Sequence, residues 1–98
     1  MRLEFHPDAE LEFIEAAVYY ERQVPGLGER FETEIRRATD LLLDQPAIGL
    51  PADPDLRKFI LTRFPFILYY SVTGDVLCIE VVAHQYRRSG YWKSRGVG

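Results

Sequence analysis

The chain has 98 residues, of which 47% are hydrophobic and 28% are charged, and its formal net charge is −3. This length suits one globular domain, residues 1–98, and leaves no room for a second core. The composition excludes a disordered chain. The single cysteine, Cys78, excludes an internal disulfide framework and a cysteine-rich zinc site.

The sequence predicts no membrane segment. The N-terminus lacks the basic-then-apolar pattern of a signal peptide, and the longest apolar run without a charge, residues 64–74, is too short to span a bilayer. We therefore expect a cytoplasmic protein that does not enter a membrane.

Charge is divided unevenly along the chain. Residues 1–55 contain 13 acidic residues and 5 arginines, a net charge of −8, whereas residues 56–98 contain 7 basic and 2 acidic residues, a net charge of +5. A basic half often carries a working surface, although two differently charged solvated faces would give the same pattern.

A short strand over 2–6 and a helix over 8–23 are predicted first. Apolar and polar residues alternate in the strand, Pro7 ends it, and Asp8 is a good N-cap for a helix with acidic residues in its first turns. Apolar residues then recur at helical spacing, and we expect them to face the core. They are Leu11, Ile14 and Val18.

Proline and glycine in the segment 24–28 interrupt this helix, and a second helix follows. Its apolar stripe includes Phe31, Ile35 and Leu42, and it ends near Gln45 because the next residue is a proline. Two helices joined by a short glycine-containing link form an antiparallel hairpin.

After a proline-rich loop at 46–55, the periodicity becomes that of strands. Three strands are expected, and a turn joins the last two as a hairpin: 56–63, 66–72 and 76–84. The predicted fold is α+β, in the order β-α-α-β-β-β, with a helix hairpin on one face of a mostly antiparallel four-stranded sheet.

The strands do not alternate apolar and polar residues. The run from Phe66 to Tyr70 is apolar or aromatic on both faces. Two helices cover one face of such a sheet, so the other face would expose Ile60, Ile67 and Tyr69. Contiguous apolar patches are rare on monomers, and we expect a partner chain to cover this one. Burial by the C-terminal tail or by a second copy remains the alternative.

The C-terminal segment 84–95 interleaves basic and aromatic residues. Guanidinium groups bind phosphates and carboxylates, and aromatic rings offer stacking surfaces, so the segment suits nucleic acid or an acidic protein surface. Alternatively, Tyr91 and Trp92 pack the tail onto the sheet and the arginines are merely solvated.

Motifs for catalysis or cofactor binding are sparse. The sequence has no nucleophile elbow, zinc-protease motif, P-loop or dinucleotide fingerprint, and we expect neither a metal nor a cofactor. Cys78 lies in a predicted strand and is expected to be a buried, inert thiol. His84, at the end of the last strand, is the one plausible general acid or base, although a histidine there more often only hydrogen-bonds.

Three motifs in this order carry a resemblance to a known family. They are Y-Y-E-x-Q-x-P-G-L-G-x-x-F ending at Phe31, R-F-P-F-x-x-x-Y from Arg63 to Tyr70, and V-x-H-x-x-R-R-x-x-Y-W from Val82 to Trp92. Together they cover nearly the whole chain. The sequence resembles the RelE/ParE toxins of bacterial type II toxin–antitoxin modules, also called plasmid stabilisation proteins.

The resemblance implies a toxin with one of two targets. RelE-like members are ribosome-dependent ribonucleases that cut messenger RNA, and ParE-like members poison DNA gyrase. In both groups an antitoxin covers exposed apolar and basic surface of the toxin. The resemblance therefore assigns Ile60, Ile67 and Tyr69 to antitoxin binding.

The ribonuclease members carry alternating basic residues on the strand after the helices, an arginine on the next strand, and an arginine and a tyrosine near the C-terminus. Here Ile67 stands where an arginine is expected, so the set is incomplete. If the chain is a ribonuclease, the resemblance assigns catalysis to four residues: His84, Arg87, Arg88 and Tyr91. It assigns binding of the target to six: Arg57, Arg63, Arg87, Arg88, Tyr91 and Trp92.

The incomplete set favours a ParE-like toxin that acts by binding rather than as an enzyme. A RelE-like, ribosome-dependent mRNA endonuclease is the alternative, and a small interaction domain without toxicity is a third. The expected partners are a cognate antitoxin and either DNA gyrase or the ribosome with its mRNA. A homodimer and a toxin–antitoxin hetero-oligomer both remain open as assemblies.

Overall fold

The computed structural model describes residues 1–87 and 90–95. The elements in this part of the chain are β1 (Arg2–Phe5), α1 (Pro7–Gln23), α2 (Leu27–Asp44), β2 (Leu50–Asp53), β3 (Leu56–Ile60), β4 (Phe66–Thr73), β5 (Val76–His84) and a short 3-10 helix, η1 (Tyr91–Arg95). None of the described helices combines the length and the apolar character that crossing a bilayer requires.

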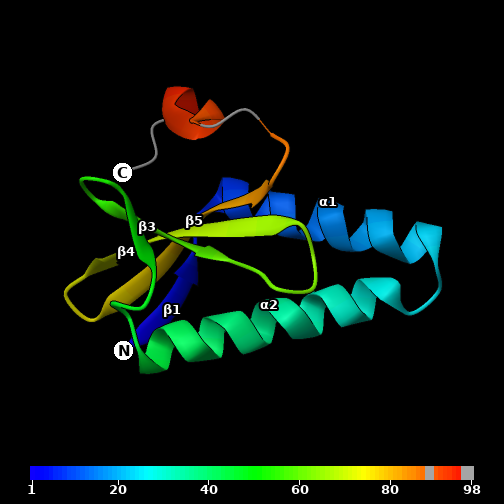
Figure 1. The fold of residues 1–98 in the computed structure, drawn as a ribbon, viewed down its shortest axis with the longest axis horizontal. Coiled ribbons are helices and arrows are strands. Elements are labelled where there is room, and N and C mark those ends of the chain that lie inside the picture. Colours follow the sequence, from blue (N-terminus) through cyan, green and yellow to red (C-terminus); the bar gives the residue numbers. More distant parts are fainter. Residues whose placement is uncertain (88–89, 96–98) are drawn as a thin grey trace.

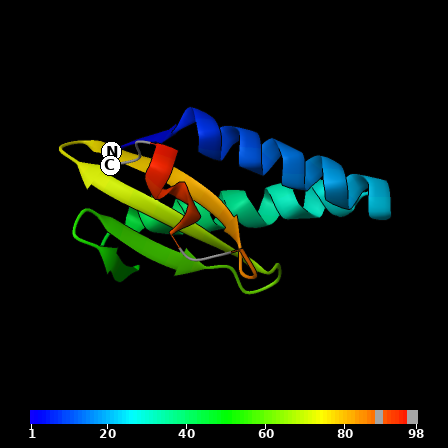
Figure 2. The same cartoon turned by 90° about the horizontal axis from the view of Figure 1, so that it is seen from above.

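The strands form one sheet in the order β1-β5-β4-β3-β2 (Figure 1). β1 pairs with β5 in parallel, and all other neighbours are antiparallel. Both helices cover one face of the sheet, while η1 lies against the other (Figure 2). The predicted α+β class, the helix hairpin and the mostly antiparallel sheet are confirmed.

The sheet in the described residues has five strands rather than the expected four. The additional strand, β2, falls in the proline-rich segment that the sequence predicted as a loop. It is an edge strand, and its pairing with β3 shifts register between Pro51 and Asp53. A proline lacks a backbone donor, but an edge position with an irregular register tolerates it. β3 is also shorter than expected, because the chain turns after Ile60.

The residue that caps the N-terminus of α1 differs from the predicted one. His6, not Asp8, is the N-cap residue, and its Nδ1 accepts a hydrogen bond of 3.0 Å from the backbone N–H of Asp8. Pro7 occupies the first turn, where its missing N–H costs nothing.

The two helices approach each other closely at their link. A Cβ on Gly28 would lie 2.6 Å from the carbonyl oxygen of Ala17, so only glycine fits there. The Glu21 carboxylate accepts hydrogen bonds from the N–H groups of Gly26 (2.9 Å) and Gly28 (3.1 Å). This carboxylate satisfies donors at the start of α2 and fixes the turn between the helices.

The prediction of which residues of α1 face the core is wrong. Leu11, Ile14 and Val18 are 56%, 49% and 43% exposed. The helix instead turns Ala9 and Ala17 into the core, with Phe13 and Tyr20 packed against it. Small alanine side chains let the α1 backbone lie close to its neighbours, which helical period alone does not reveal. On α2 the prediction holds, and the stripe that includes Leu42 is buried.

The main core lies between the helices and the sheet. Its centre is a cluster of aromatic rings whose centroids are 5.0–5.2 Å apart across the contacts of Tyr20 with Phe64 and of Phe31 with Phe64 and Phe66. Such edge and tilted contacts add to the free energy gained by burial. The cluster anchors the β3–β4 loop, which carries Phe64, onto the helix hairpin.

Candidate functional site

The C-terminal segment folds back over the face of the sheet that the helices leave free (Figure 2). The Trp92 ring lies on the Tyr69 ring with 4.2 Å between centroids, and these side chains are 4% and 7% exposed. They form a second apolar cluster with Leu56, Val81 and Ala83. The chain's own tail thus covers the centre of the face for which a partner was predicted.

A hydrogen bond to helix α1 holds this tail in place. The Tyr91 hydroxyl donates to one Glu12 carboxylate oxygen at 2.5 Å, and the other oxygen accepts from the backbone N–H of Val82 at 3.0 Å. β1 ends at Phe5, opposite Ile79, so beyond that point no strand of the described residues pairs with this edge of β5. Glu12 satisfies one donor of this free edge and ties the tail to it.

Arg87 follows β5 and precedes η1, and its side chain is exposed. Its guanidinium carbon lies 3.9 Å from the centroid of the Tyr91 ring, a cation–π contact. Arg88 was predicted beside it, but it lies outside the described residues, so its roles in target binding and catalysis stay predictions.

His84 has the structural role that a strand-end histidine often has. Its Nδ1 accepts a hydrogen bond of 3.1 Å from the N–H of Tyr86, and its ring packs against Phe66 and Tyr86 at 5.2 Å each. These contacts close the turn after β5. The ring is half-buried, and its predicted use as a general acid or base remains a prediction.

Arg57 is engaged by the loop before β2. Its Nη1 donates to the carbonyl oxygens of Gly49 at 2.7 Å and Ala47 at 3.3 Å. Arg57 pairs with Tyr70, whose fully buried side chain belongs to the helix-side core, so both side chains emerge on that face of the sheet. The tail lies on the opposite face.

Arg63 lies on the β3–β4 loop and lines a cleft against α2, again on the helix side. The structure therefore brings Arg87, Tyr91 and Trp92 together on the far face and leaves Arg57 and Arg63 apart from them. Trp92 packs the tail onto the sheet and is almost fully buried, so a target that binds here contacts mainly the residues around it. The predicted role of Trp92 itself in target binding stays a prediction.

The residues assigned to antitoxin binding differ in exposure. Ile60 is 46% exposed, and Ile67, its partner across β3 and β4, is half-buried on the same face. Tyr69 lies under Trp92 and reaches another chain only when the tail moves. Antitoxin contact at these three positions stays a prediction.

Two lysines that the sequence analysis did not assign lie at the tail, Lys58 beneath it on β3 and Lys93 within η1. Lys58 pairs with Tyr69 across β3 and β4, and it lines a small recess with Trp92 and Lys93. The pairing register places Lys58 on the tail side, and this register is not visible in the sequence. Glu12 was missed as well, since nothing in an acidic helix marks one carboxylate as structural.

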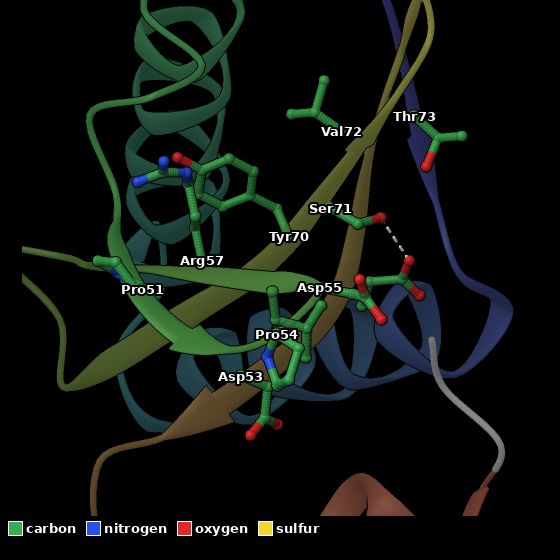
Figure 3. A pocket seen from close by; sticks show the side chains of 11 residues that line it. Pro51, Asp53, Pro54, Asp55, Arg57, Tyr70, Ser71, Val72 and Thr73 are labelled. Atoms are coloured by element: carbon green, nitrogen blue, oxygen red, sulfur yellow. Dashed lines mark hydrogen bonds between the residues drawn. The ribbon is translucent and has the colours of Figure 1, made fainter.

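A shallow pocket lies at the end of the sheet between the β2–β3 hairpin and strands β4 and β5 (Figure 3). The Ser71 hydroxyl donates to the Glu80 carboxylate at 2.7 Å beneath it, while Arg57 and Tyr70 lie together toward the loop before β2. Among residues 1–87 and 90–95 no group of histidine, cysteine, aspartate or glutamate side chains is arranged to hold a metal ion.

Cys78 lies near this carboxylate. Burial and the neighbouring Glu80 raise the pKa of the Cys78 thiol to about 11, so the thiol is protonated at neutral pH. A protonated thiol is a poor nucleophile. Cys78 is half-buried rather than buried as expected, and its inert role stays a prediction.

Solved structures of other proteins have the same fold, and two of them are described here. A chain described as the chromosomal ParDE toxin–antitoxin system from P. aeruginosa matches with a TM-score of 0.76 and 20% identity, over 86% of this chain and 95% of that one. The isolated E. coli RelE toxin matches with a TM-score of 0.66 and 21% identity, over 96% and 94%. No curated protein sequence matches.

A match to a family model shows which protein family the chain belongs to. The model described as the ParE toxin of the type II toxin–antitoxin system parDE matches residues 3–88, which include both helices, strands β2 to β5 and all of β1 except its first residue. The chain therefore belongs to the ParE toxin family of type II toxin–antitoxin systems.

Proposed function

We propose that the protein is a toxin that binds DNA gyrase, that it does not cut RNA, and that a cognate antitoxin neutralises it. Residues 1–98 act as one domain in this proposal, in the cytoplasm where gyrase works. The observation that carries it is the separation of the basic residues that the resemblance assigns to the target, because Arg57 and Arg63 lie on the helix side of the sheet, away from Arg87 and Tyr91.

Cleavage of RNA through a 2′-hydroxyl needs cations around one phosphate and a group that moves a proton. The Arg57 guanidinium donates hydrogen bonds to two loop carbonyl oxygens on the helix side of the sheet. Arg63 lines a cleft with α2. Tyr91 donates its hydroxyl to Glu12, on the far face. In this arrangement Arg57 and Arg63 cannot add their charges to a phosphate that binds beside Arg87 and Tyr91.

The far face offers a surface for binding instead. Arg87 is exposed above the Tyr91 ring, and Lys58 and Lys93 line the recess beside the tail. Cations spread over a packed apolar base suit a large acidic partner, because charges at the rim speed association and set orientation. The family membership supports gyrase as that partner.

Antitoxin neutralisation is supported by apolar surface that the fold leaves open. Ile60 is exposed on the sheet, and Leu11, Ile14 and Val18 form a stripe along the outer face of α1. Exposed apolar groups in such number are typical of proteins with a partner. The ParDE match supports a partner of the antitoxin type.

Two assays on the purified chain test the proposal. We expect it to inhibit ATP-dependent supercoiling of relaxed plasmid by gyrase, and we expect the antitoxin encoded beside it to restore supercoiling. We expect no cleavage of mRNA on purified ribosomes. Ribosome-dependent cleavage without any effect on gyrase would establish the RelE-like alternative, and activity in neither assay would establish a non-toxic interaction domain.

A further inference from the structure

A second basic site lies on the helix side of the molecule, away from the tail. It is a cleft between α2 and the β3–β4 loop. Arg30 and Arg37 come from α2, and Arg63 comes from the loop. Leu27 and Phe64 add apolar lining. Three arginine side chains from two elements thus line one cleft together with two apolar side chains.

Contacts within the protein fix both walls of the cleft. Glu34 is buried on α2, where it accepts a hydrogen bond of 3.2 Å from the Thr62 hydroxyl and pairs with Arg37 at 3.4 Å. The Phe64 ring packs on Tyr20 and Phe31 in the aromatic core. The loop is therefore tied to the helix at two points, and a ligand would meet a cleft that is already formed.

The chemistry of the lining selects the ligand. The Arg37 side chain is 58% exposed, and Arg30 and Arg63 are exposed as well, so all three can reach an anion. Glu29 and Glu34 also line the cleft, and they would repel a continuous phosphate backbone. A peptide with spaced carboxylates and an apolar side chain fits this mixture better, because guanidinium groups bind carboxylates bidentately and Phe64 offers an apolar contact.

The cleft is also continuous with surface already assigned to a partner. Ile60, which is 46% exposed, immediately precedes the loop that carries Arg63. A segment that covers Ile60 can therefore continue around the loop into the cleft. The 1–55 region is strongly acidic overall, so an acidic segment gains its attraction at these arginines rather than along the helices in general.

We propose that this arginine cleft binds an acidic segment of the antitoxin, with carboxylates on Arg30 and Arg63 and an apolar side chain against Phe64. The inference rests on the proposed function, which supplies the antitoxin, and adds to it a second contact site on the helix side. The target-binding tail on the far face stays free of this contact.

The test compares the affinity of purified toxin variants for the antitoxin encoded beside the gene. The variant is Arg30→Glu/Arg63→Glu, and the control is Arg2→Glu, because Arg2 is an exposed arginine on β1 that lines neither this cleft nor the groove beside Val18. We expect the dissociation constant of the double variant to rise about tenfold or more at low salt, with a weaker dependence on salt than wild type. The control should change it by less than about threefold.

The outcomes separate this inference from the proposed function. An unchanged dissociation constant for the antitoxin in the double variant overturns the proposal. A double variant that loses affinity for single-stranded RNA but keeps its affinity for the antitoxin overturns it as well. If the melting temperature shows that the double variant is unfolded, Arg63→Glu alone, in a loop, decides in the same assay. Gyrase inhibition is measured for the wild type alone, and its absence there contradicts the proposed target without bearing on the cleft. Failure of the wild type to bind the antitoxin overturns both.

Discussion

The Glu12 carboxylate lies where three parts of the chain meet. It belongs to α1, it accepts a hydrogen bond from the N–H of Val82 on the part of β5 beyond the end of β1, and it accepts another from the Tyr91 hydroxyl of the tail. Hydrogen bonds to a charged acceptor are stronger than those between neutral groups. One side chain therefore connects the helix layer, the sheet and the covering segment.

Removing this carboxylate should cost more than removing one of its partners. We expect Glu12→Ala to lower the free energy of unfolding by about 2–3 kcal/mol, because the half-buried N–H of Val82 loses its acceptor. Tyr91→Phe, the matched control, removes one hydroxyl and should cost about 1 kcal/mol. Urea denaturation of the three proteins measures the difference. Equal stabilities for wild type and Glu12→Ala would show that the junction is not structural.

The Cys78 thiol gives a prediction that depends on pH. Its pKa rises from an ordinary value of 9.0 to about 11 in the folded chain. The folded state therefore keeps the proton longer than the unfolded state, so the contribution of Cys78 to stability is complete below pH 9 and is lost as the pH rises toward 11.

Thiol labelling measures that shift directly. We expect the rate of iodoacetamide labelling in the folded protein to rise with a midpoint near pH 11, since only the thiolate reacts. The same chain unfolded in urea is the control, with a midpoint near 9. A midpoint near 9 in the folded protein would show that burial and Glu80 do not hold the proton on the thiol.

At the scale of elements, the two helices present their apolar residues differently. The stripe on α2 is buried, with Leu42 fully inaccessible, whereas the stripe of Leu11, Ile14 and Val18 on α1 faces outward. The helix is held instead by alanines, by aromatic rings and by the close approach at Gly28. An outward apolar stripe costs α1 nothing in folding and leaves it free for a partner.

A matched pair of truncations distinguishes the two faces. Leu42→Ala should lower the free energy of unfolding by about 2–5 kcal/mol, because it opens a cavity in the main core. Ile14→Ala should lower it by less than about 1 kcal/mol, since half of this side chain is already in water. Both are read from chemical denaturation midpoints. Similar losses for the two variants would mean that the Ile14 face is covered within the folded chain.

The sequence predicted the elements whose pattern is local. Helical period, the break at 24–28 and the turn around Gly74 place the helix hairpin and the β4–β5 hairpin close to where they are. It did not predict which of two apolar faces of α1 is buried, because alanines carry little hydropathy but permit close packing. It missed β2, since three prolines at 46–54 mark a loop unless the strand is known to lie at an edge.

The candidate site was predictable in its residues but not in their grouping. The mixture of basic and aromatic residues marked the tail, yet only the fold shows that Trp92 packs on Tyr69 while Arg87 stays exposed. Arg57 and Arg63 belong to the same predicted strand as Lys58, but register and the turn after Ile60 send them to the helix side. Contacts such as Tyr91 with Glu12 join residues far apart in sequence, and no local pattern encodes them.

For the whole molecule, the two basic surfaces lie on opposite faces of a thin sheet-and-helix sandwich. The principal extents of the Cα trace are 39 × 29 × 21 Å. Ile60 and Arg63 are three positions apart in the chain, so their Cα atoms are at most about 11 Å apart, and a few extended residues of a partner reach from the exposed Ile60 to the arginine cleft. An antitoxin segment can thus occupy the helix side and the loop while the tail remains a separate surface for the target.

The final prediction concerns that tail. Replacing Arg87 and Arg88 by alanine should abolish inhibition of gyrase and toxicity in induced cells, because an acidic target loses two charge-assisted contacts of about 1.5–3 kcal/mol each. The fold should survive, since the exposed contact of Arg87 with the Tyr91 ring is worth only about 0.5–1 kcal/mol. Arg22→Ala/Arg36→Ala, on the acidic half of the chain, is the control and should keep full toxicity. Thermal melts of both double variants check folding, and full toxicity in a folded Arg87→Ala/Arg88→Ala protein would place the target-binding surface elsewhere on the molecule.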